Sequence, residues 1–290
     1  ALPISLDVVQ WVSLLMQFFP SRGLRLLALL ATSLVAGCAV LTPGVTVDPA
    51  QNDRAAATIA TSPWVTFPGS GWEHYRLPGK RAADFRYVRI DDRDAVAVRS
   101  ESAASMLRRV LDVPAEEVGR IRFSWKVPAL IDAADLAQRD KDDAPVRIVL
   151  AFDGDRSQFS TRDAMLSDLA RAVTGEEMPY ATLMYVWCNK RPAGETVMNP
   201  RTGRIRKLVV ESGVQALGQW RDYERDVRAD FERVFGEPPG RLIGVAIMTD
   251  TDNTRSRARA WYGPVSLVSA EGAAQATPAN PVVAPVPSLR

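Results

Sequence analysis

Five consecutive polar residues near the end of the chain could carry chemistry. Asp250-Thr251-Asp252-Asn253-Thr254 follows the apolar run 242–248, so these side chains would lie at the end of a hydrophobic strand. An aspartate in such a place can act as a nucleophile toward phosphorus. Carboxylate and amide oxygens are also the hard ligands that calcium prefers. Asp, Asn and Thr equally favour tight turns, because their side chains bond nearby backbone groups.

The spacing D-x-D-x-T is the nucleophile signature of haloacid-dehalogenase-like phosphatases, but its surroundings do not fit that chemistry. Those enzymes place the motif early in an alternating α/β domain and use a phosphate-binding lysine farther along. Here only 40 residues follow Asp250, and the last lysine of the chain is Lys207. The context that the motif requires is therefore missing, and we exclude a phosphatase.

A calcium-binding EF-hand is excluded as well. Counting from Asp250, position six is Arg255 where glycine is required, and position twelve is Trp261 where a glutamate is required. A calcium site of another kind remains open, with Asp250, Asp252 and Asn253 as its ligands. The two alternatives are a purely structural turn, in which Thr254 closes a local hydrogen bond, and direct contact with a ligand. Apart from calcium, the sequence indicates no cofactor.

A second polar group precedes another predicted strand. Asp142 and Asp143 stand just before residues 145–152, which carry Arg147 on the polar face. If this strand lies beside the strand that ends at Asp250, Arg147 could pair with Asp250 or Asp252, since guanidinium groups match carboxylates. Two carboxylates across a cleft would also suit a polysaccharide hydrolase or lyase. An acid from each group is the pair that such an enzyme would use.

An aromatic and an amide follow a third predicted strand. Trp187 could stack on the face of a sugar while Asn189 bonds its hydroxyls, as in many sugar-binding clefts. The predicted ligand-binding set is Asp142, Asp143, Arg147, Trp187, Asn189, Asp250, Asp252, Asn253 and Thr254. No residue is predicted to be catalytic.

The composition argues against nucleic-acid binding and against histidine-rich metal sites. The net charge is +2, and the 36 basic residues are dispersed, so nucleic acid is not expected as a partner. His74 is the only histidine, which excludes metal sites rich in histidine. Beside Trp72 and Tyr75, His74 is expected to be a packed or surface residue.

Alternation of apolar and polar residues dominates the chain and predicts the fold class. In residues 120–127 the apolar face consists of Ile121, Phe123, Trp125 and Val127. Roughly nine segments of this kind predict strands with one buried and one wetter face. Two segments predict helices instead: residues 160–175, with Ser160 and Asp163 in capping-box spacing, and residues 226–240, which end in Gly and Pro. We therefore expect a mainly β, jelly-roll-like β-sandwich with two short helical excursions.

The start of the chain predicts export and lipidation. Residues 1–15 precede Met16 and are expected to be an upstream extension of the reading frame. Residues 16–37 have the basic, apolar and small-residue parts of a signal peptide. They end in Val35-Ala36-Gly37-Cys38, which resembles a bacterial lipobox and implies a lipid on the thiol of Cys38. Ala39 follows in place of the Asp that retains lipoproteins at the inner membrane, so we expect an outer-membrane anchor facing the periplasm.

The rest of the chain divides into three parts. Residues 38–62 are small and polar and are expected to form the lipidated N-terminus and a flexible tether. Residues 63–270 form the predicted β-sandwich domain. Residues 271–290 are rich in Pro and Ala and predict a disordered tail.

Several blocks occur in an order typical of one bacterial family. They are "DDAPVRIVLAF" at 142–152, "LMYVW" at 183–187, "VVESG" at 209–213 and "GVAIMTDTDNTRSRARAWYG" at 244–263. With these blocks the chain resembles the domain-of-unknown-function family 3047 from about Trp72 to Val268. The resemblance implies an exported bacterial protein and supplies no catalytic residue. In that family glycine usually follows the TDTDNT block, whereas Arg255 stands there in this chain, which puts a tight turn with positive φ in question.

These features favour a non-catalytic lipoprotein whose β-sandwich binds a glycan or another envelope component. Its partners would be the lipid bilayer, through Cys38, and that glycan. The first alternative is an envelope polysaccharide hydrolase or lyase that uses the paired carboxylates. The second is a structural partner in an envelope protein complex.

Overall fold

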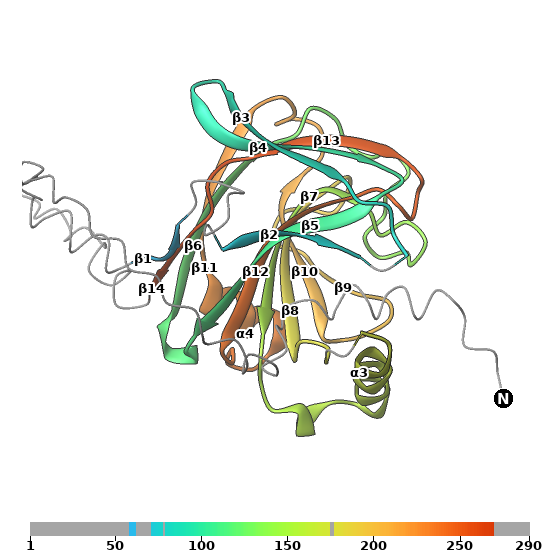
Figure 1. Ribbon diagram of the computed structural model, residues 1–290, viewed down its shortest axis with the longest axis vertical. Coiled ribbons are helices and arrows are strands. Elements are labelled where there is room, and N and C mark those ends of the chain that lie inside the picture. The colour runs from blue at the N-terminus through green and yellow to red at the C-terminus, as the bar shows by residue number, and fades with distance from the viewer. Residues whose placement is uncertain (1–57, 62–70, 78, 175–176, 270–290) are drawn as a thin grey trace, which may run out of the picture.

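Two sheets packed face to face make up most of the structure, which is a computed structural model (Figure 1). It describes residues 58–61, 71–77, 79–174 and 177–269. Sheet A contains β1 (Thr58–Thr61), β3 (Asp84–Ile90), β4 (Arg93–Glu101), β6 (Val118–Lys126), β11 (Trp220–Asp226), β13 (Arg257–Tyr262) and β14 (Ser266–Ser269). Sheet B contains β2 (Trp72–Arg76), β5 (Ala104–Val113), β7 (Ala144–Phe152), β8 (Ala181–Cys188), β9 (Thr196–Met198), β10 (Ile205–Ser212) and β12 (Leu242–Asp250). The predicted jelly-roll-like β-sandwich is confirmed.

The order of the strands places distant parts of the chain side by side. Sheet A runs β1-β14-β6-β13-β4-β3, and β11 also pairs with β6. Sheet B runs β2-β5-β12-β7-β8-β10-β9. All pairs are antiparallel except β8 with β10. These two are parallel because the long connection 189–204 returns the chain to the end of the sheet where β8 begins.

The main core lies between the sheets, where the alternating apolar residues meet. Ile121, Phe123 and Trp125 of β6 face Ile148 of β7 and Tyr185 of β8, and all five are at most 3 % exposed. The rings of Phe123 and Tyr185 stack at 5.5 Å between centroids. Fully burying one such side chain contributes about 1.5–3 kcal/mol, so these contacts hold the two sheets together.

The central strands of sheet B are buried on both faces, whereas the sequence predicted one buried and one more exposed face. Every residue of β7, β8 and β12 is buried. A second apolar cluster covers the outer face of sheet B, and it includes Leu136 from a loop and Leu166 from a helix. Alternation alone could not reveal this second layer, because the covering residues come from distant segments.

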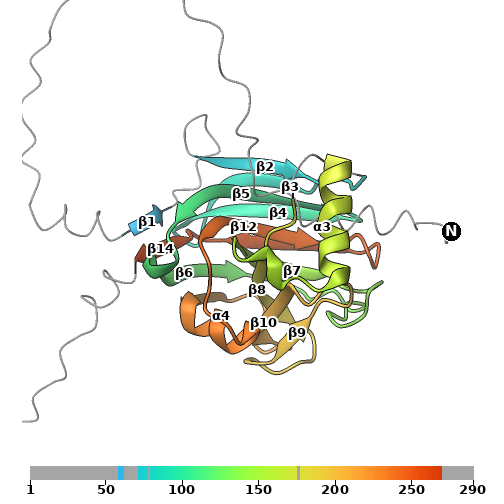
Figure 2. The same cartoon turned by 90° about the horizontal axis from the view of Figure 1, so that it is seen from below.

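Both predicted helices are present. α3 (Thr161–Thr174) lies beside sheet B, and the amide of Asp163 donates to the Ser160 hydroxyl at 3.1 Å, as the capping-box spacing predicted (Figure 2). The predicted end of this helix at Gly175 lies outside the described residues. α4 (Val227–Phe235) is capped by Asp226, which accepts from the Ala229 amide, and it ends at Gly236 with φ 74°. Short 3-10 turns occupy Ala115–Glu117 and Arg156–Gln158.

Several sequence predictions concern residues that the structure does not describe. The upstream extension, the signal peptide, Cys38 and the tail at 271–290 all lie outside the described ranges. The predicted tether differs at its end, since Thr58–Thr61 pairs with β14 as strand β1. Within the described ranges, neither helix is long and apolar enough to cross a bilayer.

Candidate functional site

The two predicted acid groups meet at one end of sheet B. β12 ends at Asp250 and pairs antiparallel with β7, and Asp250 lies opposite Ala144. Asp142 and Asp143, which enter β7, are therefore brought to the end of β12 as predicted. The loop that follows β12, residues 251–256, closes over the same corner.

Asp142 belongs to a sealed ionic network. Its carboxylate accepts from Arg147 Nη2 at 3.1 Å and from Lys207 Nζ at 2.5 Å, and all three side chains are at most 1 % exposed. Lys207 also donates to the backbone oxygen of Leu136 at 2.9 Å. Burial lowers the pKa of Lys207, and the charge of Asp142 opposes that shift. Asp142 therefore ties β7 to β10 and cannot meet a ligand.

Lys207 was not among the predicted site residues, although the sequence carries a signal for it. It stands between Ile205 and Val209 on β10, at a position whose alternation partners are both buried. A lysine in an apolar row requires a buried carboxylate or carbonyl partner. The distant Asp142 supplies that partner, so only the tertiary structure identifies it.

Asp143 holds the 251–256 loop in shape. Its Oδ1 accepts from the backbone amide of Asn253 at 3.2 Å and from the side-chain amide at 3.0 Å. Its Oδ2 accepts from the Thr254 amide at 2.8 Å and from the Thr254 hydroxyl at 2.5 Å. Asp143 thus holds the loop from another strand, where the turn interpretation expected bonds from the loop's own Asp and Asn residues. The local hydrogen bond predicted for Thr254 is present, between its hydroxyl and the Ser256 hydroxyl at 2.8 Å. Arg255 closes the loop with φ 53°, so the tight turn forms without glycine.

Asp250 and Asp252 complete the corner. Asp250 is fully buried, neither of its carboxylate oxygens has a hydrogen-bond partner, and Arg147 Nη2 lies 3.4 Å from Oδ2. The predicted pairing of Arg147 with Asp250 is confirmed, through one nitrogen only. Burial raises the pKa of Asp250 well above its usual range, while Arg147 opposes this shift and the carboxylates of Asp252 and Asp143 add to it. Asp252 forms an ion pair with Lys80 near the surface.

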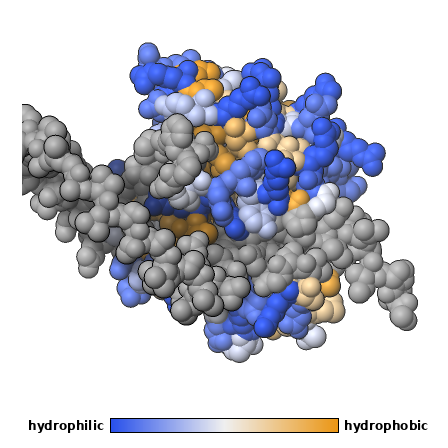
Figure 3. Space-filling view, in the orientation of Figure 1, coloured by the Kyte–Doolittle hydropathy of each residue, from blue (hydrophilic) through white to orange (hydrophobic). Residues whose placement is uncertain are grey.

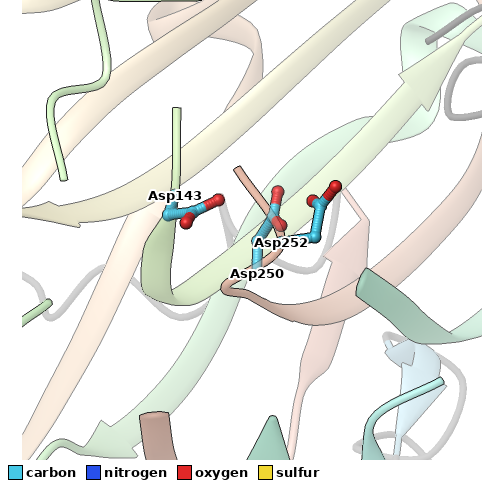
Figure 4. Close-up of side chains that lie close together, drawn as sticks. All are labelled: Asp143, Asp250 and Asp252. Atoms are coloured by element: carbon cyan, nitrogen blue, oxygen red, sulfur yellow. The ribbon is translucent and has the colours of Figure 1, made fainter. Parts of the chain in front are cut away.

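Three carboxylates converge at this corner. One oxygen each from Asp143, Asp250 and Asp252 lies within 4.8 Å of the others, and the three side chains point toward a shared space (Figure 4). The grouping replaces the predicted set, because the Asn253 amide donates to Asp143 while the Asp143 carboxylate joins the cluster. Beside it lies a depression of about 650 Å³, with Lys80, Asp252 and Asn253 in its lining.

Trp187 and Asn189 do not join this corner. Trp187 is 1 % exposed, packs in the core between the sheets, and donates from Nε1 to the Gly213 oxygen at 3.0 Å. The side-chain amide of Asn189 donates to the backbone oxygens of Ile131 at 2.7 Å and Ala134 at 3.3 Å. The predicted stacking of Trp187 on a sugar is therefore wrong, because a ring without an exposed face offers no platform.

A row of aromatic and basic residues lies instead on the outer face of sheet A. Trp220 of β11 and Trp261 of β13 both lie opposite Lys126 of β6, on either side of it. The adjacent Trp125 and Tyr262 are buried, so the alternation of the strands turns this row outward. Both tryptophans of the row are partly exposed. Figure 3 shows that the described residues visible in its view are mainly hydrophilic, with apolar patches between them.

The tip of the β3–β4 hairpin fixes this row. Asp91 and Asp92 form its two-residue turn with φ 50° and 58°, the backbone of a type I′ turn. Asp91 accepts from Lys126 Nζ at 2.7 Å and from Trp220 Nε1 at 3.0 Å. These hydrogen bonds hold the pKa of the Asp91 carboxyl below its usual value.

A depression of about 640 Å³ adjoins Trp220. The guanidinium of Arg93 lies 5.2 Å from the Trp220 ring centroid and pairs with Asp222 at 2.6 Å. Arg93 and Asp222 line the depression, together with Arg122, Ser124 and Glu224. The sequence did not predict this site, because "WRDYERD" lacks the apolar alternation that marks a half-buried strand, and its pairing with β6 is long-range.

Comparison with known proteins identifies the family. A model described as "Protein of unknown function (DUF3047)" matches residues 70–266. The chain belongs to this family. The resemblance carried by the TDTDNT block and its neighbours is thus confirmed. A search of curated proteins finds no match.

Several solved structures are distant matches. A family 11 carbohydrate-binding module from Clostridium thermocellum, in complex with a mixed-linked tetrasaccharide, is 10 % identical, covers 73 % of this chain and 96 % of its own, and has a TM-score of 0.36. The xyloglucanase domain of NopAA from Sinorhizobium fredii, in complex with cellobiose, is 8 % identical, with coverages of 72 % and 98 % and a TM-score of 0.39. Endoglucanase 3 of Trichoderma harzianum is 11 % identical, with coverages of 72 % and 94 % and a TM-score of 0.34. At these values the likenesses carry no argument about what this chain binds.

Proposed function

We propose that this protein is a lipid-anchored lipoprotein of the bacterial outer membrane that faces the periplasm and binds an envelope glycan without cleaving it. The observation that carries the binding proposal is the outward row of Trp220, Lys126 and Trp261. Neighbouring strands lie about 4.8 Å apart, so the backbones of the two tryptophans are separated by roughly 10 Å. Two indole rings at that separation can each contact a different sugar unit of one extended chain.

Polar groups around the row supply the remaining requirement of a sugar site. Sugars combine an apolar face with a rim of hydroxyls, so aromatic surfaces must be accompanied by donors and acceptors. Lys126, Arg93 and Asp222 lie beside the rings, and Ser124 contributes a hydroxyl to the adjoining depression. Binding at this surface replaces the cleft around Trp187, which does not exist as predicted.

The hydrolase alternative is disfavoured by the burial of the acids. Asp142, Asp143 and Asp250 are at most 1 % exposed, and Asp142 is already paired with Arg147 and Lys207. A glycosidase needs both carboxyl groups beside the scissile bond. A sugar could not reach these side chains without opening the corner of the sandwich.

A pull-down with purified peptidoglycan and a panel of bacterial envelope polysaccharides tests the proposal. The full chain should be retained by at least one glycan, and Trp220→Ala and Trp261→Ala should each weaken binding about 5- to 30-fold, which corresponds to about 1–2 kcal/mol of lost contact. Met165→Ala is the matched control, because Met165 is 63 % exposed on α3, away from the row. It should bind as the unaltered chain does.

Three results would overturn the proposal. Retention of no glycan would remove the ligand, and unchanged binding by both tryptophan variants would remove the site. Cleavage of a retained polysaccharide would favour the hydrolase or lyase alternative. If envelope proteins were retained in place of glycans, the structural-partner alternative would take over.

A further inference from the structure

The three convergent carboxylates are positioned by the pairing of β7 with β12 and by the loop that follows β12. Asp143 stands at the entrance of β7 and Asp250 at the end of β12, and the pairing of these strands fixes the separation. Asp252 follows in the loop and faces the same space (Figure 4). The three oxygens lie within 4.8 Å of one another. Calcium holds oxygen ligands at about 2.3–2.6 Å, so ligands on opposite sides of one ion are separated by about 4.6–5.2 Å.

Asp250 is the side chain that this corner leaves unsatisfied. It is completely buried, and neither of its oxygens has a hydrogen-bond partner. Its nearest cation, Arg147, is shared, because the same Nη2 atom lies 3.1 Å from Asp142 and 3.4 Å from Asp250. A buried carboxylate without donors is costly unless a cation or a proton reaches it. This observation is independent of the clustering of the acids and indicates that Arg147 meets the charge of Asp250 only in part.

We propose that Asp143, Asp250 and Asp252 bind a calcium ion, which would satisfy Asp250 and lock the 251–256 loop onto the end of sheet B. All three ligands have hard oxygen atoms, but the Asp143 oxygens already accept four hydrogen bonds from Asn253 and Thr254, so calcium would have to replace some of them. The cluster contains neither histidine nor cysteine, so softer transition metals are disfavoured. Asp252 gives the ion its route from solvent, because it lines the depression beside the cluster. The ion would have to pass the basic residues that also line this depression, Lys80, Arg81, Arg139, Arg201 and Arg255. The inference stands apart from glycan binding, which is proposed at another surface.

Lys80 is the competitor of the ion. Its ammonium group pairs with Asp252, and both side chains are 12 % exposed. Calcium would have to displace it from that carboxylate. Removing the ammonium should therefore strengthen calcium binding, an effect that a purely structural ion pair would not produce.

Calcium titration with terbium luminescence and isothermal calorimetry tests the site on the full chain. We expect saturable binding of one ion, with a Kd no weaker than about 10⁻³ M, the range of extracellular calcium modules. Asp250→Asn should abolish the binding, and Asp252→Asn should weaken it at least tenfold. Lys80→Met should tighten it several-fold. Asp140→Asn is the matched control, since Asp140 is an exposed acid that lines the same depression, and it should leave the affinity unchanged.

Thermal unfolding gives a second readout that keeps the test decisive. Calcium should raise the Tm of the unaltered chain and leave that of Asp250→Asn unchanged. Without calcium, the Tm of Asp250→Asn serves as the reference for the calcium shift, because the change also removes an ion-pair partner of the buried Arg147. If Asp250→Asn fails to fold, the calcium affinity of Asp252→Asn tests the site instead, because Asp252 lies in a half-buried loop where the change should not prevent folding. No saturable binding by the unaltered chain, equal affinity for magnesium, or full binding by Asp252→Asn would overturn the proposal.

Discussion

Single residues in the left-handed backbone region mark where this chain accepts strain. Asp91, Asp92 and Arg255 have φ between 50° and 58°, and each lies in a turn that shapes a candidate site. Asp tolerates this region better than most residues, because its short side chain can bond locally. Arg255 lacks a short polar side chain of this kind, so its positive φ is expected to be strained.

Replacing Arg255 with glycine should relieve that strain. We expect Arg255→Gly to raise the free energy of unfolding by roughly 0.5–1 kcal/mol, after the greater freedom of glycine in the unfolded chain is counted. Urea denaturation measures the change. Arg257→Gly is the control, because Arg257 is an exposed residue within β13, and it should lower the stability by a similar amount. A loss of stability in both variants would show that the turn does not strain Arg255.

His74 is the only histidine, and it is held neutral. Its Nε2 lies 3.0 Å from the Ser105 hydroxyl oxygen, which already accepts the Ala83 amide at 2.9 Å. The Ser105 hydrogen is therefore free to point at an unprotonated Nε2. Partial desolvation of the exposed side chain lowers the pKa of His74 from 6.5, the charge of Arg76 adds to this, and Asp84 opposes it. The sequence expectation of a packed or surface role fits this placement.

The lowered pKa of His74 predicts a dependence of stability on pH. Between the lowered folded pKa and about 6.5 the unfolded chain binds more protons than the folded one, so stability should fall as the pH drops through this window. The loss should stay below about 1 kcal/mol, since the side chain is exposed to solvent. Denaturation at about pH 5 and about pH 7.5 measures it. His74→Gln should show a smaller difference between the two conditions, and an unchanged difference would assign the dependence to other groups.

At the scale of elements, a buried ionic network of Asp142, Arg147 and Lys207, here called the clasp, connects β7 and β10. These two strands are not paired directly in the sheet, since β8 lies between them. Lys207 of β10 and Arg147 of β7 converge on Asp142, which precedes β7, and Lys207 also reaches the loop at Leu136. The clasp lies under the outer apolar layer of sheet B. It therefore connects that layer to the central strands.

Breaking the clasp should cost more than removing any surface pair. Asp142→Ala leaves two buried cations short of a partner and should lower the free energy of unfolding by about 3–5 kcal/mol. The exposed neighbour Asp140 is the control, and Asp140→Ala should change stability by less than about 0.5 kcal/mol. Asp142→Ala combined with Lys207→Met should lose less than the sum of the single changes, because the second removes one orphaned charge. Additive losses, measured by urea denaturation, would contradict the clasp.

At the scale of the whole molecule, the proposed lipid anchor and the proposed glycan-binding surface have separate roles. The lipid on Cys38 would keep the protein at the outer membrane, and the row on sheet A would hold a glycan. A single lipid chain gives only marginal membrane binding, so stable anchoring would require the two acyl chains of a diacylglycerol on the Cys38 thiol. Localisation is therefore predicted to depend on one residue.

Cys38→Ser should release the protein from the membrane fraction into the soluble periplasmic fraction. Cell fractionation of the bacterium that makes the protein measures this shift. Cys188→Ser is the matched control, because Cys188 is buried at the end of β8 and should leave the protein on the membrane. If the Cys38 variant stayed membrane-bound, the lipobox interpretation would fail.

Local patterns in the sequence were sufficient for the helices, for the central strands and for the family, but not for β1 or β11. The alternation at 120–127 predicted a strand with Trp125 inside, and the Ser160 and Asp163 spacing predicted the start of α3. The same pattern placed Asp142 and Asp250 at strand ends. These features depend on neighbours in the chain, so periodicity and spacing carry them.

Only the tertiary structure decided which side chains meet and which reach solvent. Trp187 has the same local features as a sugar-binding tryptophan, but it is buried in the core between the sheets, while Trp220 and Trp261 come outward from segments about 40 residues apart. Lys207 and Asp142 are 65 positions apart and form one ion pair. The burial of a side chain and the pairing of strands depend on residues that are far apart in the sequence. Patterns among adjacent residues therefore cannot predict them.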